Sequence, residues 1–338
     1  MKDKMIPLDA GERIRDYVRQ QIENRRSMEE LEKYCRSSEF AALPEKEKAK
    51  YLEELAHAYY RHAYRRPYMV ADESEDTLGK AYAIWHELLE QPEEDSRVTE
   101  FRRRELAYLC AAFVEMYRDS GSRGSLAEAQ RYAEEAVRNY GAEETYETGR
   151  VYRDLGACAL QQQEPQKAAE YYRKAEACWR KDELAELPVM KRNIAELCST
   201  IGKILGETGS REEKYEYLLE AYRILSELKL QANSGDPDVD NRHYWMEFGQ
   251  SAFDLAEVLR EFDQTEEAEQ HYLIALAAYE TACRRYEGAF GLADRIIRTR
   301  EPLRQMYEEQ GRMAEAEKYS TDERIVLREI RNLRKNVE

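Results

Sequence analysis

Four acidic side chains in one predicted linker have the spacing of a calcium-binding loop. The segment GDPDVDNRHYWMEF places carboxylates at positions 1, 3, 5 and 12 of an EF-hand type loop, on Asp236, Asp238, Asp240 and Glu247. Asn241 stands at position 6, where glycine normally makes the turn, although asparagine also adopts the left-handed conformation. These carboxylates are a candidate calcium site. An acidic linker that caps a helix without any metal is the simpler interpretation, and we expect no cofactor.

Two histidine-containing stretches match metal motifs only in part. In HAYYRHAYRRPY (57–68), His57 and His62 are five residues apart, so a helix points them to different faces and they cannot chelate one ion from the same side. The arginines and the proline that follow are typical of a helix end. In HELLE (86–90), Glu90 stands where a zinc-protease helix needs its second histidine. We interpret both stretches as structural helix positions.

The sequence contains no other motif that would form a catalytic site. The chain has no GxSxG nucleophile elbow, no glycine-rich phosphate loop and no Walker lysine. Its six cysteines are widely spaced and contain no CxxC pair, which favours reduced, buried thiols over zinc or redox chemistry. The sequence therefore predicts that the protein is not an enzyme.

Composition excludes two classes of partner. With 53 Lys and Arg against 69 Asp and Glu, the formal charge is -16, which repels the phosphate backbone of nucleic acids. No apolar run approaches the 18 or so residues that a membrane helix needs, and the first residues lack the apolar segment of a signal peptide. We expect a cytoplasmic protein that binds neither nucleic acid nor membrane.

Apolar residues recur at three- and four-residue spacing almost throughout, and strand patterns are nearly absent, so we predict an all-α fold. Three segments repeat one another: YRDLGACALQQQEPQKAAEYYRKA, CSTIGKILGETGSREEKYEYLLEA and AFDLAEVLREFDQTEEAEQHYLIA. At the same position of their first helix they carry Gly156, Gly202 and Ala256. A small residue there lets the second helix of an antiparallel pair approach closely.

This pattern resembles the tetratricopeptide repeat family. Weaker copies upstream, around Leu55 and Phe113, and downstream, around Leu303, bring the total to about six helical hairpins. The resemblance implies a right-handed α-solenoid, which we divide into an N-terminal helical cap (1–48) and a repeat array (49–338). The small positions lie 46 and 54 residues apart instead of about 34, so the repeats are closer to those of kinesin light chain and of bacterial regulators.

The resemblance also implies a concave groove lined by the first helix of each hairpin. Mapped onto this chain, the groove-lining positions are His57, Tyr60, Tyr108, Arg118, Arg150, Arg153, Lys203, Phe253 and Arg260. Arginine and tyrosine suit a protein or peptide partner, and the basic lining favours an acidic one. Solvated helix faces are the alternative for any single position.

Two functions follow from the resemblance. The first is a protein-interaction scaffold or adaptor that binds a peptide or protein segment in the groove. The second is a peptide-sensing regulator that controls a response regulator or an enzyme. Binding of chaperone tails is disfavoured, because no asparagine occupies a groove position.

Overall fold

The computed structural model describes residues 28–65, 71–120, 125–141, 145–235, 239, 241–286 and 289–335. Within these ranges all regular structure is helical, so the predicted all-α class is confirmed. The chain forms two compact units, Met1–Tyr171 and Tyr172–Glu338, whose border falls inside one helix. The hairpin pattern of the sequence does not indicate this border.

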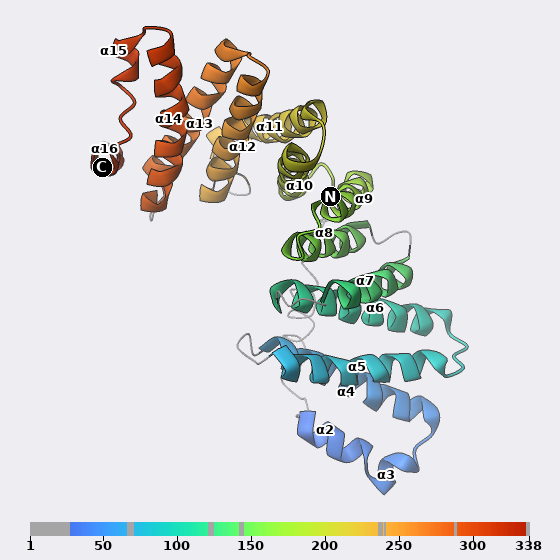
Figure 1. The fold of residues 1–338 in the computed structure, drawn as a ribbon. Coiled ribbons are helices and arrows are strands. Elements are labelled where there is room, and N and C mark those ends of the chain that lie inside the picture. Colours follow the sequence, from blue (N-terminus) through green and yellow to red (C-terminus); the bar gives the residue numbers. More distant parts are fainter. Residues whose placement is uncertain are drawn as a thin grey trace. The chain divides into compact units, whose positions relative to one another are not determined.

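Unit 1 is built from helical hairpins (Figure 1). Helix α4 pairs with α5 and α6 pairs with α7, while α6 also contacts α8. Two short helices, α2 and α3, precede them in the part of the predicted N-terminal cap that the structure describes. The helices of this unit are α2 (Met28–Cys35), α3 (Ser38–Ala41), α4 (Glu45–Arg65), α5 (Ala71–Glu90), α6 (Ser96–Ser120), α7 (Ser125–Tyr140), α8 (Thr145–Gln161) and the first part of α9 (Pro165–Lys181).

Unit 2 continues the same arrangement, with hairpins α10/α11 and α12/α13. Its last hairpin departs from the pattern, because the second helix, α15, has only four residues, and the amphipathic α16 packs against α13 and α14 with Val326 and Ile330 buried. The helices are the rest of α9, α10 (Pro188–Thr208), α11 (Arg211–Asn233), α12 (Arg242–Glu261), α13 (Thr265–Arg285), the 3-10 turn η2 (Ala289–Leu292), α14 (Ala293–Glu309), α15 (Met313–Ala316) and α16 (Glu323–Lys335).

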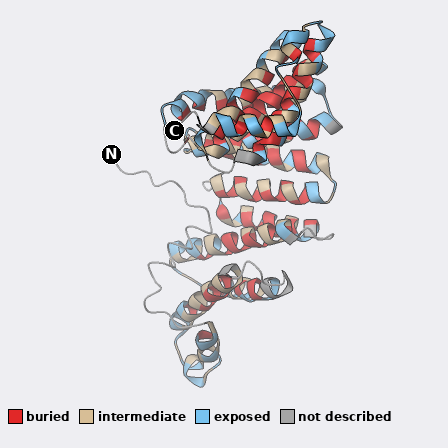
Figure 2. Ribbon diagram, turned by 90° about the vertical axis from the view of Figure 1, so that its left-hand side faces the viewer, coloured by how far each residue is buried: buried red, intermediate tan, exposed pale blue. Residues whose placement is uncertain are grey.

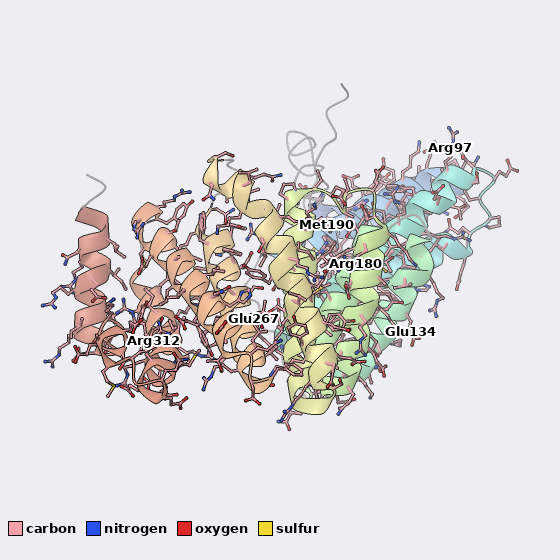
Figure 3. All side chains as sticks on the ribbon, turned by 90° about the horizontal axis from the view of Figure 1, so that it is seen from above. Arg97, Glu134, Arg180, Met190, Glu267 and Arg312 are labelled. Atoms are coloured by element: carbon pink, nitrogen blue, oxygen red, sulfur yellow. The ribbon has the colours of Figure 1, made fainter. Side chains whose placement is uncertain are left out.

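The helices of each unit meet through their apolar faces. In both units buried residues lie where neighbouring helices face one another, and exposed residues lie on the outer sides (Figure 2). Charged side chains cover the outer faces, as the 87% exposed side chain of Arg97 shows where it projects from the start of α6 (Figure 3). None of the described helices is long and apolar enough to span a bilayer.

Close helix crossings depend on small residues, as the sequence pattern predicts. A Cβ atom on Gly202 of α10 would lie 2.9 Å from Leu218 Cγ of α11. Ala256 of α12 is fully buried. At a third small residue, Gly249, the approach is closer than at Gly202, because a Cβ there would lie 2.6 Å from the ring of Tyr279 on α13. The repeat pattern of the sequence does not mark Gly249.

Tyrosine-to-glutamate hydrogen bonds tie neighbouring helices together in both units. Each tyrosine hydroxyl donates to a carboxylate on an adjacent helix, and burial, followed by the nearby carboxylate, raises the pKa of these tyrosines. The pairs are Tyr59 with Glu32, Tyr82 with Glu135 at 2.6 Å, Tyr117 with Glu75 at 2.7 Å, Tyr272 with Glu257, and Tyr307 with Glu269 at 2.8 Å.

The thiols are free, as the sequence predicts. Four cysteines are buried and two are half-buried: Cys110, Cys158, Cys198 and Cys283, then Cys35 and Cys178. Burial raises the pKa of Cys158 and of Cys198 to about 12, which keeps both thiols protonated and unreactive at neutral pH.

Helix α11 begins with a hydroxyl cap from Ser210. Ser210 Oγ accepts hydrogen bonds from the backbone N–H groups of Glu212 at 3.2 Å and Glu213 at 3.3 Å. The Ser210 hydroxyl itself donates to Glu212 Oε2 at 2.6 Å.

Removing this cap should weaken unit 2. The change Ser210→Ala leaves two backbone N–H groups without their protein partner, and it should cost about 1 kcal/mol of unfolding free energy. Denaturant unfolding followed by far-UV circular dichroism measures this loss. Ser234→Ala, which removes a hydroxyl at the other end of α11, should cost less, because that hydroxyl donates to a carbonyl and caps no N–H group. Equal losses for the two variants would contradict the cap.

Candidate binding surfaces

The aromatic groove positions of unit 1 are buried. Tyr60 of α4 is 6% exposed and Tyr108 of α6 is 8% exposed. The Tyr108 ring packs edge-on against Tyr140, with 5.3 Å between ring centroids. Glu147 and Arg150 of α8 act on the same Tyr140 hydroxyl, whose pKa burial raises well above its usual value. These tyrosines therefore belong to a buried polar cluster and offer little area to a partner.

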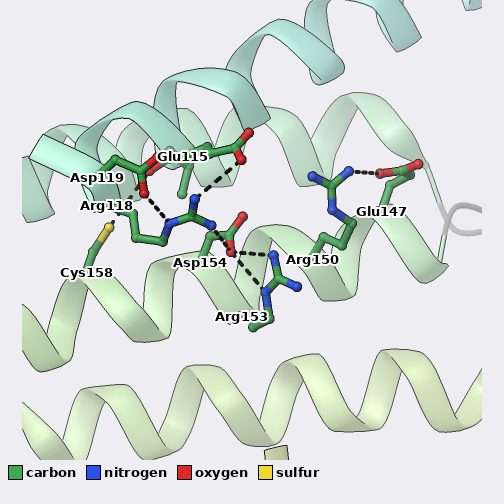
Figure 4. Close-up of polar contacts among 9 residues, drawn as sticks. Glu115, Arg118, Asp119, Glu147, Arg150, Arg153, Asp154 and Cys158 are labelled. Atoms are coloured by element: carbon green, nitrogen blue, oxygen red, sulfur yellow. Dashed lines mark hydrogen bonds and ion pairs between the residues drawn. The ribbon is translucent and has the colours of Figure 1, made fainter. Parts of the chain in front are cut away.

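The arginines of the predicted unit 1 groove face carboxylates of their own helices and of the neighbouring helix (Figure 4). Asp154 of α8 is 4% exposed and accepts from two arginines at once. Arg118 Nη1 of α6 lies 2.8 Å from Asp154 Oδ1, and Arg153 donates to the same oxygen through Nε at 3.0 Å and Nη2 at 2.8 Å. Asp154 is thus a shared anchor that holds α6 against α8.

The same surface carries more negative than positive charge. Arg118 also contacts Glu115 and Asp119, and Arg150 Nη1 lies 3.2 Å from Glu147 Oε2. Three arginines therefore meet four carboxylates, Glu115, Asp119, Glu147 and Asp154. The local excess of positive charge predicted from the sequence is absent from this group of side chains, because these four carboxylates lie beside the arginines.

Removal of the shared carboxylate should destabilise unit 1. Asp154→Ala leaves Arg118 and Arg153 without their common partner, and breaking a buried ion pair typically costs 3–5 kcal/mol. The two arginine side chains keep 23% and 35% exposure and so remain partly hydrated, and we expect a loss of about 2 kcal/mol in denaturant unfolding. Asp119→Ala, whose side chain is 65% exposed, should cost less than about 0.5 kcal/mol. Similar costs for both variants would contradict the anchoring role.

The first helices of unit 2 are joined by polar bridges. Lys203 Nζ of α10 lies 2.8 Å from Asp254 Oδ2 of α12, and Gln250 Nε2 donates to the other oxygen of Asp254 at 2.8 Å. Arg295 Nη1 of α14 donates to Gln250 Oε1 at 2.9 Å. At the opposite end, both oxygens of Glu247 on α12 are held by Arg192 of α10. The bridges align α10, α12 and α14 as one polar surface.

A cavity of about 370 Å³ opens on this surface of unit 2. Three apolar side chains contribute to its wall, and polar side chains of both charges surround them. Its lining residues are Arg192, Ala195, Glu196, Ser199, Thr200, Lys203, Leu225, His243, Met246, Glu247, Gln250, Ser251 and Arg295. Lys203 is the one predicted groove residue among them; the rest come from positions that the groove pattern of standard tetratricopeptide repeats does not include.

The other two predicted positions of unit 2 lie outside this lining. Phe253 is 5% exposed and packs under the guanidinium of Arg298, 5.1 Å from the ring centroid. Arg260 lies near the end of α12, 3.9 Å from Glu257. Phe253 therefore contributes to helix packing, and Arg260 contributes to a local ion pair.

The candidate calcium loop is described only at its last carboxylate. Asp236, Asp238 and Asp240 lie outside the described residues. Arg192 Nε and Nη2 hold the two oxygens of Glu247 at 2.9 Å and 3.0 Å. Among the residues that the structure describes, no group of three His, Cys, Asp or Glu side chains could hold a metal ion.

The two histidines of the metal-like stretches each face one carboxylate. His57 Nδ1 lies 3.7 Å from Glu105 Oε2 of α6, and burial, together with nearby Glu53, raises the pKa of Glu105 to about 7. His86 Nε2 lies 2.7 Å from Glu135 Oε1. Both histidines therefore belong to pairs that link neighbouring helices.

Comparisons with known proteins found solved structures only. No protein-family model matches the chain, and no curated protein matches it. The apo form of RapI is 15% identical, with a TM-score of 0.46 over 84% of this chain and 99% of RapI. BtubC (BKLC) from P. vanneervenii is 16% identical, with a TM-score of 0.45 over 83% of this chain and 94% of that one.

A third solved structure is the Rap conjugation gene regulator of the plasmid pLS20 in complex with the Phr* peptide. It is 13% identical, with a TM-score of 0.29 over 84% of this chain and 96% of the regulator.

Proposed function

We propose that this chain is a non-enzymatic scaffold or adaptor that binds a peptide or protein segment on the first-helix surface of unit 2. One observation carries the proposal: the cavity of about 370 Å³ bordered by α10, α12 and α14. Its volume falls within the range of about 300–1,000 Å³ that is typical of ligand sites. A peptide that crosses it would meet hydrogen-bond donors, acceptors and apolar side chains together.

The surface is pre-organised for binding. Arg192, Lys203 and Arg295 are each held by a partner on α12, so these long side chains lose little further freedom when a ligand arrives. Lys203 keeps a 51% exposed side chain and uses one of its three N–H donors on Asp254. These donors can meet backbone carbonyls or acidic side chains of a partner.

The compartment and the second function fit the same proposal. Six free thiols suit a reducing environment, and we propose a cytoplasmic protein on this ground.

A peptide-sensing regulator, the other function suggested by the sequence, would hold its peptide on the same surface. Measuring peptide binding therefore tests both functions.

Peptide capture tests the proposal. The full chain would be immobilised and offered a displayed library of random twelve-residue peptides, and enriched peptides would be titrated by fluorescence anisotropy. Lys203→Ala should weaken binding by about ten-fold, because a charge-assisted hydrogen bond contributes about 1.5 kcal/mol or more. The matched control is Arg284→Ala on the second helix α13, which removes an ion-paired cation of similar exposure, 46% against 51%.

Two results would contradict the proposal. The first is the absence of any retained peptide. The second is loss of binding in Arg284→Ala with none in Lys203→Ala, which would place the binding surface on the second helices. The Arg284 pair is exposed, so its loss should alter the thermal melt little, whereas Lys203 pairs with the 9% exposed Asp254, so binding by both variants is measured well below their melting temperatures.

A further inference from the structure

The cavity of unit 2 has a negative end near the start of α12. Two carboxylates, Glu196 of α10 and Glu247 of α12, line it there, and Arg192 is the lining cation beside them. Arg192 holds both oxygens of Glu247, while Glu196 is exposed. One cation against two carboxylates gives this end a formal charge of −1.

The other end of the cavity is positive. Lys203 of α10 and Arg295 of α14 line it, and Asp254, which is 9% exposed, lies behind them. Lys203 contacts Asp254 at 2.8 Å, and Arg295 reaches it only through the amide of Gln250. Two cations against one carboxylate give this end a formal charge of +1.

The two ends are separated by two helical turns. Glu196 and Lys203 are seven residues apart on α10, and Glu247 and Asp254 are seven apart on α12. At a rise of 1.5 Å per residue, the charged ends lie about 10 Å apart along the surface. An extended peptide covers this length with about three residues, since each advances about 3.3 Å.

A buried hydroxyl lies between the two ends. Ser251 of α12 follows Glu247 by one turn and lines the cavity, and the residue is 3% exposed. Its Oγ has no hydrogen-bond partner among the residues that the structure describes. Leaving a buried polar group unpaired costs free energy, so a ligand that hydrogen-bonds to this hydroxyl would gain from it.

We infer that this cavity recognises an extended peptide segment that carries a basic and an acidic side chain about three residues apart. The inference rests on the proposed function and adds the chemistry of the ligand. The basic group pairs with Glu196 and Glu247, and the acidic group pairs with Lys203 and Arg295. A small apolar residue between them packs on Ala195, Leu225 and Met246, and a backbone carbonyl or amide bonds to Ser251.

Three capped, fluorescently labelled peptides test the inference on the full chain. Their cores are Lys-Ala-Leu-Glu, Lys-Ala-Leu-Lys and Glu-Ala-Leu-Glu, and binding is measured by anisotropy. The mixed-charge peptide should bind at least about ten-fold more tightly than either peptide of uniform charge, because only it is paired at both ends.

A charge-reversal variant should change this order. Glu196→Lys turns the negative end from −1 to +1, so both ends become positive and Glu-Ala-Leu-Glu should become the tightest ligand. Glu216→Lys, at an exposed position of α11, makes the same change in net charge away from the cavity and should leave the order unchanged. Ser251→Ala should weaken binding of the mixed-charge peptide several-fold, because the ligand loses its hydrogen bond to the hydroxyl. The melting temperature should not fall, because this buried hydroxyl has no partner among the described residues of the protein.

The outcomes separate this inference from the proposed function. If library peptides bind and depend on Lys203, but the three peptides bind equally or Glu196→Lys leaves their order unchanged, the dipolar recognition is wrong and the binding function stands. If the wild-type chain binds neither these peptides nor any from the library, both are wrong.

Discussion

Gly249→Leu should destabilise unit 2 by about 3 kcal/mol, the largest effect that we expect from a single change in this protein. Even one Cβ atom at this position of α12 would lie 2.6 Å from Cε1 and 2.8 Å from Cδ1 of Tyr279. The Tyr279 ring is rigid and 1% exposed, so it cannot move aside without opening the α12/α13 crossing. The midpoint of denaturant unfolding, followed by far-UV circular dichroism, measures the loss.

The matched control is a helical glycine with open space around it. A Cβ at Gly79 of α5 would meet nothing within 4 Å, so Gly79→Leu should leave stability unchanged or raise it by up to about 1 kcal/mol through helix propensity. If Gly249→Leu does not fold, Gly249→Ala provides the same comparison with a smaller side chain. A Gly249→Ala protein as stable as wild type would show that the crossing is looser than the structure indicates.

The second large effect depends on pH. In Glu105, burial raises the pKa from 4.5 to about 7, so the folded protein binds this proton more tightly than the unfolded chain. The contribution of the protonated Glu105 to the unfolding free energy is therefore complete below pH 4.5. It falls as the pH rises from 4.5 to 7 and stays lost above pH 7. This pKa shift corresponds to a loss of about 3 kcal/mol of unfolding free energy between low and high pH. A protonated His57 beside the carboxylate would make that loss smaller.

Glu105→Gln removes the titrating group and should reverse this loss. The variant should be more stable than wild type at pH 8 and no more stable at pH 4.5, as measured by urea unfolding at the two pH values. Glu100→Gln removes the same charge from an exposed position on the same helix and is the matched control. A Glu105→Gln protein that gains nothing at pH 8 would show that the carboxylate is well solvated or fully paired in the folded state.

The hairpins could be predicted from the sequence because each helix and each close crossing depends on residues that are near one another in the chain. The three- and four-residue apolar spacing shows each helix, and Gly202 and Ala256 mark crossings that the structure confirms. Gly249 was missed because it lies at a different level of its helix, seven residues before Ala256 and two turns away. The partner that makes it critical, Tyr279, is on the next helix.

The repeat pattern shows which helices carry the predicted groove residues, but it does not show how exposed these residues are. Arg118 and Lys203 each reach the next first helix, since Arg118 meets Asp154 of α8 and Lys203 meets Asp254 of α12. Their exposure could not be read from repeat positions: Tyr60 and Tyr108 are buried, and the Tyr108 ring packs against Tyr140 of the following helix. The preference for an acidic partner stays a prediction.

The sequence by itself therefore determined the class of fold and the composition of its surfaces, because helix periodicity and net charge are local or additive properties. Only the tertiary structure decided which charges neutralise one another. Arg118 and Asp154 are 36 residues apart, and Arg192 and Glu247 are 55 apart. Ion pairs act over a few ångströms in space, so a count along the chain cannot show that one end of the unit 2 cavity is left positive and the other negative.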